Sequence, residues 1–136
     1  MFEVRVTADF AAAHFLKDYN GKCENLHGHN YKVYAHVRGS KLNEGGVLMD
    51  FSKLKAALRE VCGKLDHSNL NDMPVFDNNP SAERIAMYIY DKIIELLLNE
   101  GVDLSYQKGK QDAFLYCIDV FETETSRARY RVDELL

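Results

Sequence analysis

The stretch FEVRVTADFAAAH, residues 2–14, decides how this chain folds, because two kinds of side chain alternate along it. One set of alternating positions is apolar and ends in a histidine; it comprises Phe2, Val4, Val6, Ala8, Phe10, Ala12 and His14. The positions between them are polar or charged and comprise Glu3, Arg5, Thr7 and Asp9. A period of two residues is typical of a β-strand with one buried face. The stretch therefore predicts a strand whose buried face ends in His14.

A second alternating stretch, residues 29–38, begins with another histidine, His29. Its apolar face continues through Tyr31, Val33, Ala35 and Val37. His36 falls on the polar face, so we expect it at the surface. His27 lies two residues before His29, and both point the same way if the chain is already extended there. The rings of His14, His27 and His29 are therefore expected to converge at one end of a sheet.

Two helices and two more strands are expected further along the chain. Asp50 or Ser52 can cap a helix whose apolar side carries Leu54, Leu58, Val61 and Leu65. Ser81 can cap a second helix with Ile85, Ile89, Ile93, Leu96 and Leu97 on its apolar side. Alternation returns over residues 114–122 and 127–132. This order predicts one α+β domain spanning residues 1–136, with a four-stranded antiparallel sheet and two helices on one face.

Composition narrows the classes of function. The 136 residues carry 17 Lys and Arg against 21 Asp and Glu, so no basic excess favours nucleic acid or an anionic membrane. No apolar run approaches the roughly 20 residues that span a bilayer. Three widely spaced cysteines do not form a disulfide framework, and the N-terminus has no leader pattern, so we expect a cytoplasmic protein.

The three histidines suggest a catalytic zinc site, because catalytic zinc takes three protein ligands and leaves one position for water or substrate. Cys23 lies four residues before His27. It is either the fourth ligand of a closed structural site or a reactive thiolate beside an open one, and the residues alone leave both possibilities open.

Six motifs in succession closely resemble those of the 6-pyruvoyltetrahydropterin synthase superfamily. They are the strand ending in His14, C-x3-H-G-H at 23–29, V-L-M-D-F at 47–51, L-D-H at 65–67, N-P-S-A-E at 79–83 and E-T-x-T-S at 122–126. The three-residue gap between Cys23 and His27 looks like that of the bacterial 6-carboxytetrahydropterin synthases of queuosine biosynthesis.

The resemblance implies a T-fold subunit that assembles through its sheet into a β-barrel, as a homo-oligomer, most simply a hexamer built as a dimer of trimers. It also implies a lyase that acts on a small pterin triphosphate, 7,8-dihydroneopterin triphosphate. Zinc would be held by His14, His27 and His29 and would act as a Lewis acid.

The resemblance further assigns roles to residues outside the metal site. Cys23 matches the general base, and Asp66 and His67 match a second proton-transfer unit. Glu122 matches the carboxylate that grips the pterin ring, with Ser81 and Glu83 as further candidates for pterin contact. The candidates for binding the triphosphate are Lys22, Lys32, Arg127 and Arg129.

Glu24, directly after Cys23, leaves the product open. Within the superfamily, a glutamate near this place marks enzymes that release 6-hydroxymethyl-dihydropterin, so Glu24 is either a second base and substrate contact or a solvated loop residue. The product is expected to be 6-carboxytetrahydropterin, with 6-pyruvoyltetrahydropterin or a dual activity as alternatives. A different class of hypothesis is a zinc-stabilised structural module without catalysis.

Overall fold

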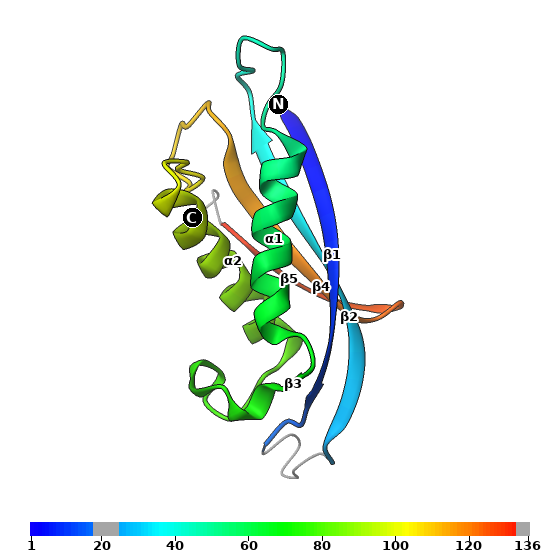
Figure 1. Ribbon diagram of the computed structural model, residues 1–136. Helices are drawn as coiled ribbons and strands as arrows, with labels where there is room; N and C mark the ends of the chain where they lie inside the picture. The colour runs from blue at the N-terminus through cyan, green and yellow to red at the C-terminus, as the bar shows by residue number, and fades with distance from the viewer. Residues whose placement is uncertain (18–24, 133–136) are drawn as a thin grey trace.

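The computed structural model describes residues 1–17 and 25–132. Its long elements, shown in Figure 1, are β1 (Phe2–His14), β2 (His27–Gly39), α1 (Phe51–Leu65), α2 (Ala82–Asn99), β4 (Phe114–Thr123) and β5 (Ser126–Arg131). Between the helices lie the short strand β3 (Ser68–Asn69) and two 3-10 turns, η1 (Leu70–Asp72) and η2 (Pro74–Phe76). The predicted order of strands and helices is confirmed.

The sheet has the strand order β3-β1-β2-β4-β5, and its four long strands are antiparallel as predicted. β1 and β2 pair along their whole length, from Phe2 opposite Gly39 to His14 opposite His27. The prediction of four strands was incomplete, because β3 adds a fifth that runs parallel to β1. Two residues are too few to show a period of two, so the sequence pattern did not indicate this strand.

Both helices cover the same face of the sheet (Figure 1). Asp50 caps α1 by accepting from the backbone N–H of Ser52, and Ser81 caps α2 by accepting from that of Arg84. The core between helices and sheet includes Val33, Ala35, Leu54, Leu58, Ile85, Ile89, Ile118 and Val120. Among the helices of the described residues, none is long and apolar enough to cross a membrane.

The opposite face of the sheet carries a buried polar network, which corrects the expectation for His36. His36 is only 8% exposed, and its Nε2 lies 2.9 Å from Asp119 Oδ2. Arg129 donates two hydrogen bonds to the same carboxylate, from Nε to Oδ1 at 2.7 Å and from Nη2 to Oδ2 at 3.0 Å. The polar face was correctly assigned, but His36 is covered because ionic partners on other strands enclose it. One of these is Glu3, whose Oε2 lies 3.3 Å from His36 Nδ1.

Candidate metal centre and active site

Three histidine rings meet at one end of the sheet, as predicted. His14 ends β1 and faces His27 across the strand pair, while His29 stands opposite Ala12. The ring centroids are 4.7 Å apart for His14 and His27, 5.1 Å for His14 and His29, and 4.8 Å for His27 and His29. Strand geometry brings the rings together. His27 and His29 are two residues apart on β2 and therefore lie on the same face of the sheet, and His14 at the end of β1 is their neighbour on that face.

Backbone carbonyl groups orient two of these rings. His14 is 1% exposed, and its Nδ1 lies 2.8 Å from the carbonyl oxygen of Pro80. Nδ1 of His27 lies 2.7 Å from the carbonyl oxygen of Asn25. A carbonyl can only accept, so each Nδ1 carries the proton and each Nε2 keeps its lone pair in a neutral ring. Metal-binding histidines are commonly oriented in this way.

Glu122 brings a carboxylate to the same place. Its Oε1 lies 2.9 Å from Nε2 of His14 and 2.9 Å from Nε2 of His29. One ligand atom from each of the four residues lies within 4.8 Å of the others. Three imidazole nitrogens and a carboxylate oxygen are donors that suit zinc, and two of the rings have their ligand nitrogen set by a backbone contact. The residues present therefore fit a zinc ion.

Glu122 was predicted to contact the pterin ring, and its closeness to the histidines was not predicted. A signal was present, since Glu122 follows Ile118 and Val120 on the apolar face of its strand. What could not be read from the sequence is that β4 lies beside β2, which brings Glu122 next to His29.

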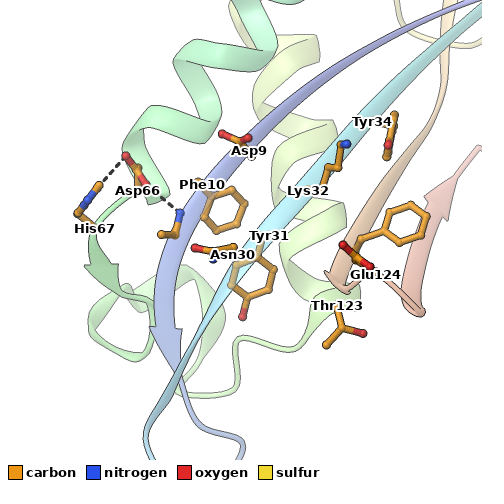
Figure 2. A pocket seen from close by; sticks show the side chains of 12 residues that line it. Asp9, Phe10, Asn30, Tyr31, Lys32, Tyr34, Asp66, His67, Thr123 and Glu124 are labelled. Carbon is orange, nitrogen blue, oxygen red and sulfur yellow. Dashed lines mark hydrogen bonds and ion pairs between the residues drawn. The ribbon is translucent and has the colours of Figure 1, made fainter.

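Asp66 and His67, predicted as a proton-transfer unit, contact each other through their side chains. His67 Nδ1 lies 2.8 Å from Asp66 Oδ2, and Asp66 Oδ1 accepts from the backbone N–H of Ala11 at 2.8 Å (Figure 2). The bond from Ala11, aided by His67, lowers the pKa of Asp66 and keeps it ionised. His67 has a left-handed backbone (φ 55°) and a side chain that is 85% exposed. A carboxylate that contacts an imidazole orients the ring and stabilises its charged form.

The Asp66–His67 pair borders a pocket of about 710 Å³, seen in Figure 2. Lys32 and Tyr34 line it from β2, and Glu124 lines it from the turn between β4 and β5. Among the triphosphate candidates that the structure describes, Lys32 is therefore the one that lines this pocket. Arg129 is instead bound to Asp119, and Arg127 Nε lies 3.8 Å from the same carboxylate.

The remaining predicted site residues divide into two groups. Ser81 is the N-cap of α2, and Glu83 is exposed in the first turn of that helix. These positions account for both residues without a ligand. Cys23, Glu24 and Lys22 lie outside the described residues.

A second group with metal-type donors consists of His36, Cys117 and Asp119, all buried. Its chemistry argues against a cation, because the Arg129 guanidinium already occupies both oxygens of Asp119. Burial also raises the pKa of the Cys117 thiol to about 11, so the thiolate that a metal needs is disfavoured. His36, Cys117 and Asp119 therefore belong to the buried polar network of the sheet and do not form a metal site.

The fold and the histidine end of the sheet define a T-fold protein with a cluster suited to a metal ion. Residues 3–133 match the 6-pyruvoyl tetrahydropterin synthase family, and the chain belongs to this family of enzymes. A 6-carboxy-5,6,7,8-tetrahydropterin synthase of Synechocystis is 39% identical over 126 residues, 89% of this chain and 86% of that protein. The human 6-pyruvoyl tetrahydrobiopterin synthase is 34% identical over 137 residues, 90% of this chain and 86% of that protein.

A solved structure agrees with the sequence matches. The 6-pyruvoyl tetrahydropterin synthase of Caenorhabditis elegans superposes with a TM-score of 0.75 at 27% identity, covering 97% of this chain and 96% of that one. The T-fold that the motifs implied is therefore confirmed.

Proposed function

We propose that this chain, as a single domain over residues 1–136, is a zinc-dependent 6-carboxytetrahydropterin synthase of queuosine biosynthesis in the cytoplasm. It would convert 7,8-dihydroneopterin triphosphate into 6-carboxy-5,6,7,8-tetrahydropterin, acetaldehyde and triphosphate. The observation that carries the proposal is the convergence of His14, His27 and His29, two of them oriented by backbone carbonyls. The 39% identity to the Synechocystis enzyme supports the choice of product.

In this proposal, His14, His27 and His29 hold zinc through their Nε2 atoms. When bound, zinc supplies Lewis acidity to the hydroxyl groups of the substrate side chain. Cys23 takes a proton as the general base, as the family resemblance implies. His67, held by the ionised Asp66, moves a second proton.

Glu122 would anchor the pterin ring by accepting from its 2-amino group and the adjacent ring N–H. Its Oε1 lies 2.9 Å from Nε2 of both His14 and His29, so this carboxylate borders the position proposed for zinc. Lys32 is the preferred triphosphate contact, since it lines the pocket beside the Asp66–His67 pair.

The Asp66–His67 pair is not part of the four-residue ligand group and lies on the far edge of β1. We therefore propose that a neighbouring subunit brings this pair to the zinc site, within a homo-oligomer that is a hexamer built as a dimer of trimers. β5 and the part of β1 that does not pair with β3 form the edges of the sheet, and such edges could pair with a second copy to close a barrel.

Two alternatives remain distinct from this proposal. The 34% identity to the human enzyme supports 6-pyruvoyltetrahydropterin as product, and Glu24 supports 6-hydroxymethyl-dihydropterin. A noncatalytic module would instead close the zinc shell with Cys23.

The test is to incubate the zinc-loaded protein with dihydroneopterin triphosphate and identify the pterin products by mass. We expect the 6-carboxy product, and a His27→Ala protein should show none. The pyruvoyl or hydroxymethyl pterin as main product would support an alternative enzyme. If Cys23→Ala keeps full zinc but loses about 100-fold or more in rate, the thiol is a base; loss of zinc would indicate the structural module.

A further inference from the structure

The side chain of Asn71 is bonded to both backbone groups of Phe15, the residue that follows the proposed ligand His14. Asn71 Oδ1 accepts from the Phe15 N–H at 2.9 Å, and Asn71 Nδ2 donates to the Phe15 carbonyl at 3.0 Å. The pairing of β3 with β1 ends at Ala13. Two residues further on, the Asn71 carboxamide makes the hydrogen bonds to Phe15 that a neighbouring strand would make. It extends the support of β1 past His14.

Asn71 also holds the loop that leads to α2. Its Nδ2 lies 3.2 Å from the carbonyl oxygen and 3.1 Å from the Oδ1 of Asn78. Asp77 and Asn78 both have left-handed backbones, with φ of 48° and 58°. Asp and Asn tolerate this conformation better than other non-glycine residues, so the sequence suits a tight turn here. Asn71 ties this turn to the end of β1.

The same loop ends at Pro80, whose carbonyl oxygen contacts His14 Nδ1 at 2.8 Å inside the protein. Asn79 adds a second tie to the strand end, since its Oδ1 accepts from the Lys17 N–H at 2.6 Å. The position of the Pro80 carbonyl, and with it the rotation of the His14 ring, therefore depends on how the loop is fastened to β1.

We propose that Asn71 is a positioning residue of the metal centre: by fastening residues 77–80 to Phe15, it sets the His14 ring through the Pro80 carbonyl. Asn71 touches neither metal nor substrate in this role. The inference rests on the proposed function, because it needs His14 to be a zinc ligand.

The test compares Asn71→Ala and Asn71→Asp with the wild type. The alanine removes every side-chain bond. The aspartate keeps the shape but turns the donor into an oxygen that faces three carbonyl oxygens, one of Phe15 and two of Asn78. We expect zinc affinity, measured by competition with a chelator, to fall about 10-fold to 100-fold in both. The Co²⁺-loaded proteins should also change their d–d absorption, which reports ligand geometry independently of activity.

Asn43→Ala is the matched control. Asn43 Oδ1 accepts from the N–H groups of Gly45 (2.9 Å) and Val47 (3.1 Å) in the loop between β2 and α1, at the other end of the sheet (Figure 1). Like the Asn71 variants, this variant should have a lower free energy of unfolding in urea. It should nevertheless keep the wild-type zinc affinity and Co²⁺ spectrum.

The outcomes separate the two proposals. If the wild type binds zinc and both Asn71 variants bind it equally well with the same Co²⁺ spectrum, Asn71 is only a structural residue. If the wild type and His27→Ala show the same weak zinc binding, the metal centre fails and this inference fails with it. If Asn71→Ala does not fold, the isosteric Asn71→Asp decides.

Discussion

Glu122 is the residue whose position allows two different roles at the proposed site. It lies at the end of β4, 30% exposed in its side chain, with one carboxylate oxygen 2.9 Å from two of the three histidines. Two functions are compatible with this position, a fourth zinc ligand and a pterin anchor beside the zinc. If Glu122 is a zinc ligand, removing its negative charge should lower the zinc content. If Glu122 is the pterin anchor, removing the charge should weaken binding of the pterin ring.

We expect Glu122→Gln to weaken pterin binding while zinc content stays unchanged. The amide keeps the shape but presents a donor to a donor, and each lost charge-assisted bond costs about 1.5–3 kcal/mol. Unsubstituted pterin isolates this effect, because it lacks the side chain that zinc would hold, and calorimetry measures its affinity. Zinc loss with unchanged pterin affinity would identify Glu122 as a ligand. Glu44→Gln, in the exposed loop between β2 and α1, is the control.

At the scale of elements, contacts between charged and polar side chains join four strands on the face of the sheet that carries no helix. Asp119 on β4 contacts His36 on β2 and Arg129 on β5, and Glu3 on β1 contacts His36 and Arg38. Burial alone would raise the pKa of Asp119, but the bonds and charge of Arg129 outweigh it and hold this pKa below its ordinary value. The Asp119 carboxylate therefore stabilises the sheet in its ionised form.

Asp119→Asn should lower the free energy of unfolding at pH 7 by about 1.5–3 kcal/mol, the usual value for a bond to a charged group. Because the folded-state pKa is depressed, this contribution is present above the unfolded pKa of about 3.9 and disappears as the pH falls through the folded-state value. Urea unfolding should thus show the difference from wild type shrinking below about pH 4. A constant difference down to pH 2 would contradict this, and Asp112→Asn, in an exposed loop, is the control.

At the scale of the whole molecule, the proposed catalytic groups sit in two places. The zinc ligands lie at the end of β1 and β2, whereas His67 is held on the outer edge of β1 by its backbone bond to the Ala11 carbonyl (2.6 Å). The edges of the sheet, β1 over much of its length and β5, are where a second copy would pair. Assembly and catalysis are therefore linked in the proposal.

Mixing two inactive variants tests this link. His27→Ala lacks a zinc ligand and His67→Ala lacks the proton-transfer imidazole, so each alone should be inactive. If every site combines two subunits, dissociating and reassembling an equal mixture should restore up to about a quarter of the wild-type activity. A mixture as inactive as its components, with mixed oligomers verified by mass spectrometry, would show that one subunit supplies the whole site.

The four long strands, the two helices with their caps, and the meeting of three histidines at one end of the sheet could all be predicted from the sequence. These features follow from local periods and capping groups, which need no knowledge of distant partners. Ser81 at the start of α2 and His14 at the end of β1 are examples.

Which distant residues meet could not be predicted from these local patterns. β3 is too short for a period, His36 is buried by partners up to 83 positions away, and Glu122 reaches His29 because β4 lies beside β2. Asn71 contacts Phe15, the residue after His14, across 56 positions. The physical reason is the same throughout: hydrogen bonds and ion pairs depend on distances in space, which strand order and register set after the local elements have formed.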